Sequence, residues 1–112
     1  MSTKSPANLL TNQILDFFFA NRIFAYRANS LGVYDSRKGI FRSSPKKGIS
    51  DLIAIIPPHG RFIGIEIKIG KDKQSEEQKG FQSNILRAGG VYLIARDYDS
   101  FIREITPHLP PS

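Results

Sequence analysis

The chain has 112 residues, a formal net charge of +6 and no cysteine. This length fits one domain, since domains most often run to about 100–150 residues, and the missing thiols exclude a disulfide scaffold, a cysteine nucleophile and a thiolate zinc site. No apolar run reaches the roughly 18–20 residues of a membrane-spanning helix, and the first residues lack the apolar stretch of a secretory signal. We therefore expect one intracellular domain over residues 1–112, with no membrane partner, whose basic charge favours an anionic partner.

The first predicted element is a helix from Ala7 to Asn21, in which Leu10 and Ile14 recur at helical spacing with the phenylalanines. The consecutive residues Phe17, Phe18 and Phe19 point about 100° apart around a helix, so one covering surface does not bury them all. We expect this helix to be enclosed, or to be shared with a second subunit.

A short strand is predicted from Ile23 to Ala28, and a basic segment follows it over residues 30–50. Residues 1–47 hold eight basic and two acidic side chains, whereas residues 48–112 hold eight of each, so the excess charge lies in the first part. The segment is long for a structureless loop and predicts a functional loop or a bent hairpin. Its basic side chains are the candidate nucleic-acid contacts: Arg37, Lys38, Arg42, Lys46 and Lys47. The alternative is a solvated loop that only improves solubility.

Two strands are predicted next, joined by the turn Pro57-Pro58-His59-Gly60. The run Leu52–Ile56 is continuously apolar, which is typical of a strand covered on both faces. Phe62–Ile69 alternates, so that Glu66 and Lys68 share one face. If the two strands pair across the turn, Asp51 at the start of the first lies beside Glu66 and Lys68 at the end of the second.

The last part of the chain predicts a helix, a strand and a closing helix. Ser75-Glu76-Glu77-Gln78 matches a capping box and begins a helix to about Gly89, with Phe81, Ile85 and Leu86 on its inner face. Val91–Ala95 reads as a buried strand and Ser100–His108 as an amphipathic helix, before a tail over residues 107–112. This order of elements predicts an α/β fold in which a mixed central sheet is flanked by helices on both faces.

The residues that suggest chemistry are Asp51, Glu66, Lys68 and Gln78. Carboxylates are hard ligands suited to Mg²⁺ or Mn²⁺, which promotes attack of water on a phosphodiester. An ammonium beside the metal can orient the nucleophile and stabilise the anionic transition state. The alternative is that Glu66 and Lys68 are only the polar face of a half-exposed strand, and that Gln78 only satisfies backbone N–H groups in its capping box.

The combined pattern resembles the VRR-NUC (virus-type replication-repair nuclease) family of the PD-(D/E)xK nucleases. It consists of Gly48-Ile49-Ser50-Asp51, an apolar strand, Glu66-Ile67-Lys68, Gln74–Gln78 and Gly89-Gly90-Val91. The resemblance implies a restriction-endonuclease-like core with Asp51, Glu66 and the backbone carbonyl of Ile67 as metal ligands. It also implies Lys68 as the catalytic lysine and Gln78 as a residue that positions the site.

The chain departs from the family pattern at two places. Ser50 stands where the family usually has a proline, at a backbone position that leads into the strand. The family often has a first-helix glutamate that completes the metal site, but residues 5–21 contain none. Gln13 is the candidate substitute because it lies at the edge of the apolar face, and Asn8, Asn12 and Asp16 are alternatives. An amide oxygen is a weaker ligand than a carboxylate, so the number of metal ions stays open.

These observations predict a Mg²⁺- or Mn²⁺-dependent endonuclease that hydrolyses phosphodiester bonds in DNA, with no small-molecule cofactor. By resemblance to stand-alone members of the family, we expect a homodimer that acts on branched DNA such as four-way (Holliday) junctions. The alternative is a non-catalytic DNA-binding module that retains the nuclease fold. An RNA-binding protein of the RRM type is not supported, since the chain lacks that aromatic motif.

Overall fold

A computed structural model describes residues 5–28, 33–42 and 48–111 of the chain. The helices are α1 (Pro6–Ala20), α2 (Glu76–Arg87), α3 (Tyr98–Ile105) and the short 3₁₀ helix η1 (Thr106–His108). One sheet contains β1 (Phe24–Arg27), β4 (Leu52–Ile56), β5 (Arg61–Ile67) and β6 (Val91–Ala95), and a second contains β2 (Val33–Asp35) and β3 (Ile40–Arg42).

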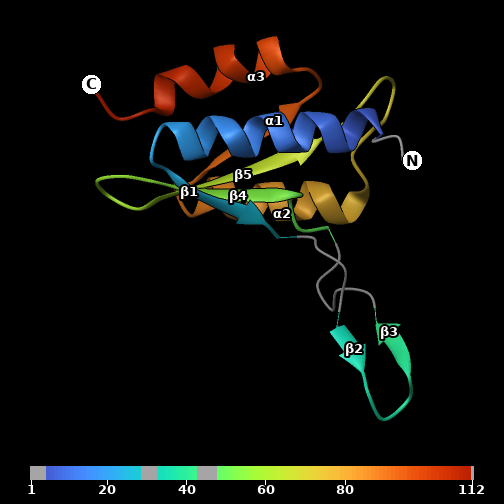
Figure 1. Cartoon of the computed structure of the whole chain (residues 1–112). Helices are drawn as coiled ribbons and strands as arrows, with labels where there is room; N and C mark the ends of the chain where they lie inside the picture. Colours follow the sequence, from blue (N-terminus) through green and yellow to red (C-terminus); the bar gives the residue numbers. More distant parts are fainter. Residues whose placement is uncertain (1–4, 29–32, 43–47, 112) are drawn as a thin grey trace.

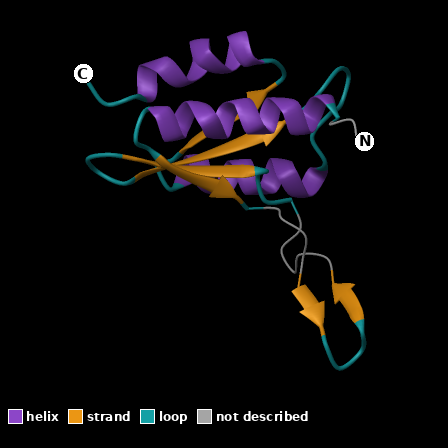
Figure 2. Cartoon of the chain, in the orientation of Figure 1, coloured by secondary structure: helices purple, strands orange, loops and turns teal. Residues whose placement is uncertain are grey.

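The larger sheet has four strands in the order β1-β4-β5-β6 and is mixed. β4 pairs antiparallel with β1 and β5, whereas β6 pairs parallel with β5 after the crossover through α2. Helices α1 and α3 cover one face and α2 covers the other (Figures 1 and 2). The predicted α/β architecture with helices on both faces is therefore confirmed.

The main core lies between the sheet and the α1–α3 layer. Leu52, Ile63 and Ile65 point into it and are fully buried, as are Phe18 of α1 and Phe101 of α3. The Phe18 and Phe101 rings meet edge to face with their centroids 5.7 Å apart. Helix α3 thus supplies the second covering surface that the phenylalanine run requires.

Phe17 and Phe19 have different environments on α1. The Phe17 ring packs edge to face on Phe101, at 5.5 Å between centroids. Phe19 keeps 85% of its surface exposed. Enclosure within one chain therefore accounts for two of the three consecutive phenylalanines, and Phe19 stays in solvent.

Helix α2 packs on β5 and β6 on the opposite face, and Ile85 is its one buried residue among those described. Ile85 is buried, but Leu86 is 52% exposed, and the prediction that Leu86 belongs to the inner face is wrong. Leu86 lies about 100° further around the helix, beyond the width that two strands can cover. Gly64 of β5 permits α2 to approach the sheet closely, since a Cβ there would lie 3.2 Å from Cδ1 of Ile85.

Helix boundaries differ from the prediction where capping decides them. α3 begins at Tyr98 rather than Ser100, because the Asp97 side chain accepts a hydrogen bond from the Ser100 backbone N–H at 2.8 Å. The α-helix ends at Ile105 and continues as η1, where Pro107 cannot donate a backbone hydrogen bond. None of the helices in the described ranges is both long and apolar enough to cross a bilayer.

The basic segment contains the β2–β3 hairpin, which lies apart from the four-stranded sheet (Figure 1). Its turn, residues 36–39, ends at Gly39 with φ +65°, a left-handed conformation that glycine adopts without strain. The turn exposes Arg37 and Lys38, and Arg42 is the last residue of β3. Lys46 and Lys47 lie outside the described residues.

Candidate active site

Two carboxylates meet where β4 begins and β5 ends. Leu52 pairs with Ile65, so Asp51 stands opposite Glu66 at the next position. The backbone N–H of Ile67 donates to Oδ2 of Asp51 at 2.7 Å. Because this N–H belongs to the strand that carries Glu66, the hydrogen bond holds the Asp51 carboxylate against that strand.

Glu66 is held at both oxygens although only 2% of the residue is exposed. The Gln78 amide donates to Oε2 at 2.6 Å, and the Tyr92 hydroxyl donates to Oε1 at 3.3 Å. The Lys68 ammonium lies 3.9 Å from Oε2 and is also largely buried. The four residues selected from the sequence, Asp51, Glu66, Lys68 and Gln78, therefore belong to one cluster on the α2 side of the sheet.

Gln78 uses both ends of its amide. Its Oε1 accepts from the Ser75 backbone N–H at 2.8 Å, and the Ser75 hydroxyl accepts from the Gln78 backbone N–H at 3.1 Å. This is the predicted capping box. Since the Nε2 group of the same side chain donates to Glu66, Gln78 does more than complete the cap, and the start of α2 is tied to the end of β5.

Burial and the neighbouring Asp51 carboxylate both disfavour the ionised form of Glu66. Burial, together with the charge of Asp51 and a side-chain hydrogen bond to it, raises the pKa of Glu66 to about 8, against the opposing charge of Lys68. At neutral pH the protonated form of Glu66 is therefore favoured, with a hydrogen bond to Asp51. A divalent cation between the carboxylates would replace that proton, so the donor chemistry fits Mg²⁺ or Mn²⁺.

The carboxylate donors of this cluster are few. In the part of the chain that the structure describes, no group of three or more acidic or histidine side chains gathers at one place. Asp51 and Glu66 would have to be supplemented by backbone oxygen, such as the Ile67 carbonyl, or by water. Mg²⁺ accepts such a set because it commonly retains several water ligands.

The polar residues of α1 that could replace the family's first-helix glutamate lie in different environments. Gln13 is exposed, and its side chain makes no hydrogen bond to any residue within the described ranges. Asn8 accepts from the Arg27 guanidinium at 3.2 Å, and Arg27 pairs with Leu52 next to Asp51. Asp16 lines a cavity with Phe24, at the other end of β1. Of the alternatives, Asn8 is the one tied to the strand end that carries the site.

Sequence reasoning missed two polar residues of the cluster, Tyr92 and Gln74. The Gln74 amide donates to the Tyr92 hydroxyl at 3.3 Å and to Oε1 of Gln82 at 3.0 Å. Burial raises the pKa of Tyr92 to about 12, which keeps its hydroxyl a donor to Glu66. A tyrosine inside the apolar run Val91–Ala95 was the available signal, since a buried Tyr hydroxyl normally has a polar partner.

Comparison with known proteins gives no information about the role of this cluster. No family model, curated protein or solved structure matches the chain. The functional assignment therefore rests on the residues and distances of the Asp51–Glu66 cluster.

Proposed function

We propose that this protein is a Mg²⁺- or Mn²⁺-dependent endonuclease that hydrolyses phosphodiester bonds in DNA, with a restriction-endonuclease-like core of the VRR-NUC type. One observation carries the proposal: Asp51 stands opposite the buried Glu66 where β4 begins and β5 ends, and the Lys68 ammonium lies 3.9 Å from Oε2 of Glu66. A buried carboxylate beside a second, half-buried carboxylate and a lysine is costly for stability alone, and such clusters are typical of functional sites.

Each residue of the cluster has a distinct role in this proposal. Asp51 and Glu66 would hold the metal with the Ile67 carbonyl, and a bound metal would supply the Lewis acidity that lowers the pKa of water and offsets phosphate charge. Lys68 orients the attacking water and stabilises charge that develops on the phosphate. Gln78 and Tyr92 fix the orientation of Glu66 through the hydrogen bonds to its two oxygens.

The basic hairpin segment supplies affinity for the DNA backbone. Arg37 and Lys38 are exposed at its turn, and the chain carries all of its excess positive charge in residues 1–47. Contacts from these side chains, with Arg42, Lys46 and Lys47, would release counterions from the phosphates. Such contacts bind without selecting a base sequence, as expected for a nuclease that recognises DNA structure.

A two-fold dimer fits the apolar surface around β1, the edge strand of the larger sheet. Phe19, Phe24 and Tyr26 are 85%, 67% and 42% exposed, and the rings of Phe24 and Tyr26 lie 5.4 Å apart. An exposed apolar edge of this kind favours pairing with a second copy. Phe18 takes no part, since it is fully buried within one chain. Two related active sites would suit branched DNA with two strands to cut.

The test of the proposed function is cleavage of labelled junction, flap, duplex and single-stranded DNA in Mg²⁺, Mn²⁺ or EDTA. We expect metal-dependent cleavage, strongest on branched DNA, and its loss in Asp51→Asn, Glu66→Gln and Lys68→Ala with binding retained. Lys71→Ala and Glu104→Gln change exposed charges outside the cluster and serve as matched controls. DNA binding without cleavage in either metal would instead identify a non-catalytic DNA-binding module.

A further inference from the structure

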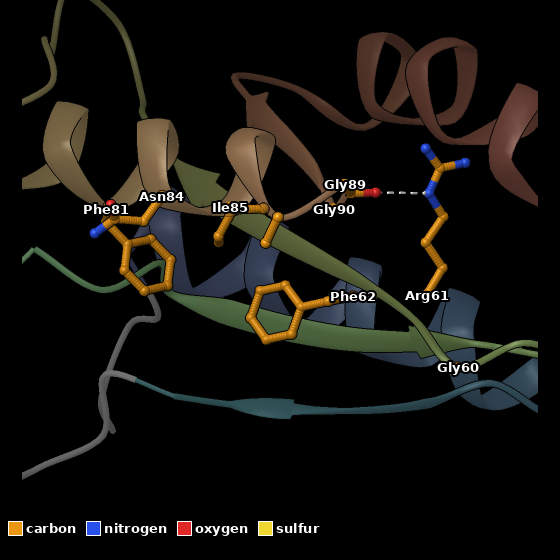
Figure 3. A pocket seen from close by; sticks show the side chains of 9 residues that line it. Gly60, Arg61, Phe62, Phe81, Asn84, Ile85, Gly89 and Gly90 are labelled. Carbon is orange, nitrogen blue, oxygen red and sulfur yellow. Dashed lines mark hydrogen bonds between the residues drawn. The ribbon is translucent and has the colours of Figure 1, made fainter.

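An aromatic groove of about 460 Å³ opens between β5 and the C-terminal half of α2. Phe62 and Phe81 form its walls, and Ile85 lies between them (Figure 3). Arg61 and Asn84 stand at its rim, where the Arg61 guanidinium donates to the Gly89 carbonyl at 3.4 Å. We call this the Phe62–Phe81 groove.

The groove lies on the same side of the sheet as the candidate active site. Phe62 and Glu66 share the α2-facing side of β5, and four residues of strand separate them by about 13 Å. The Phe81 ring packs edge to face on Tyr92 at 6.5 Å, and Tyr92 donates a hydrogen bond to Glu66. A DNA strand that passes Asp51 and Glu66 can therefore reach the groove within a few nucleotides.

The charge around the groove favours nucleic acid. None of the residues that line it is acidic, and Arg61 contributes a cation at the rim. Arg87, a second cation, donates to the Asn84 side chain. The aromatic walls offer π faces for stacking, a cation can contact an adjacent phosphate, and the Asn84 amide can hydrogen bond to a base edge.

We propose that the Phe62–Phe81 groove binds an unpaired base of the DNA strand whose phosphate occupies the Asp51–Glu66 site. This inference rests on the proposed nuclease function and specifies its substrate class. A base in a continuous duplex is stacked and paired, so it cannot enter a side pocket without disruption of the helix. The preferred substrate is therefore DNA with unpaired bases within a few nucleotides of the scissile phosphate.

The test measures binding in EDTA, so that it does not depend on hydrolysis. Fluorescence anisotropy gives the Kd for a paired duplex and for the same duplex with a three-nucleotide mismatch bubble. We expect the wild type to bind the bubble roughly 5- to 150-fold more tightly, the range for stacking of one base on aromatic side chains. A 2-aminopurine base in the bubble should change its fluorescence on binding.

Two variants act on the groove in opposite ways, because Ala88→Phe fills it and Phe62→Ser removes a wall. Both should bring the Kd ratio of duplex to bubble to within about twofold of unity while the Kd for paired duplex stays unchanged. Leu86→Ser is the matched control, since Leu86 is exposed on the same helix but does not line the groove. Thermal unfolding verifies that each variant is folded.

The outcomes separate this inference from the proposed function. A wild-type ratio near one, or folded groove variants that keep the wild-type ratio, would overturn it. A changed sedimentation mass for Ala88→Phe would also overturn it, because the groove would then be a contact between subunits. Retention of the bubble preference by a protein that never cleaves DNA would support the groove and refute the nuclease.

Discussion

Replacement of Glu66 by glutamine should stabilise the metal-free protein at neutral and alkaline pH. Glu66 is buried beside Asp51, so its ionised form is disfavoured in the folded state. Glutamine has nearly the same shape and cannot ionise. Its carbonyl can still accept from Gln78 and its amide N–H can donate to Asp51, but its NH2 group cannot accept from the Tyr92 hydroxyl, so the substitution removes the charge at the cost of that one hydrogen bond.

The magnitude follows from the pKa of Glu66, which is 4.5 for the ordinary side chain and about 8 in the folded protein. A raised carboxyl pKa means that the folded state binds the proton more tightly than the unfolded state. The contribution of Glu66 to the stability of the wild type is therefore largest below pH 4.5, falls as the pH rises from 4.5 to about 8, and changes little above that range. At 1.36 kcal/mol per pKa unit, the whole loss is about 5 kcal/mol, of which about 3 kcal/mol is reached by pH 7.

Urea denaturation in EDTA between about pH 4 and pH 9 measures this difference. The free energy of unfolding of Glu66→Gln, relative to wild type, should rise by about 1.4 kcal/mol per pH unit between the two pKa values. Glu104→Gln, on an exposed side chain of α3, should follow the wild-type curve. Parallel curves for wild type and Glu66→Gln would refute the raised pKa of Glu66.

Further predictions concern the metal, the backbone, the DNA contacts and the subunit contact. Because Glu66 is protonated below its pKa of about 8, Mg²⁺ binding near pH 7 should release about 0.9 proton per site, measured by calorimetry in buffers of different ionisation enthalpy; no release would mean that the cation binds elsewhere. Gly48→Ala should destabilise the protein by about 1–3 kcal/mol and weaken activity, since φ there is +82° and a Cβ would lie 2.5 Å from the Glu77 carbonyl carbon. Gly80→Ala, which meets no atom within 4 Å, should instead stabilise α2 by about 0.5–1 kcal/mol, and urea denaturation compares the two. Replacement of Arg37, Lys38, Arg42, Lys46 and Lys47 by serine should flatten the salt dependence of DNA binding by roughly 0.9 in log–log slope per lost contact, so an unchanged slope would exclude the segment from the interface. Sedimentation equilibrium should give twice the chain mass for the wild type and one chain mass for Phe24→Ser, and a monomeric wild type would contradict the dimer.

The parts of the structure that could be predicted are those set by neighbours in sequence. A turn of four residues fixes the pairing of β4 with β5, so Asp51 and Glu66 are brought together by local geometry. The capping box from Ser75 to Gln78 depends on one helical turn and is present as predicted. Both signals needed only residue type and spacing.

The residues that escaped prediction depend on contacts distant in sequence. Tyr92 reaches Glu66 because β6 pairs parallel with β5 in a register that the sequence does not state. The exposure of Leu86 depends on the number of strands beneath α2. The positions of Asn8 and Gln13 depend on where α1 crosses the sheet, and their spacing in the helix alone could not choose between them.

The double use of the Gln78 amide makes helix formation and site assembly a single equilibrium. When the first turn of α2 opens, the Ser75 backbone N–H loses its hydrogen bond to Gln78 Oε1, and Glu66 loses its hydrogen bond from Gln78 Nε2 in the same event. Helix ends open with small free energies, far below that of global unfolding. The fraction of molecules with a correctly oriented Glu66 is thus set by the stability of one helical turn. Changes far from the carboxylates that strengthen or weaken that turn will tune the activity of the whole site.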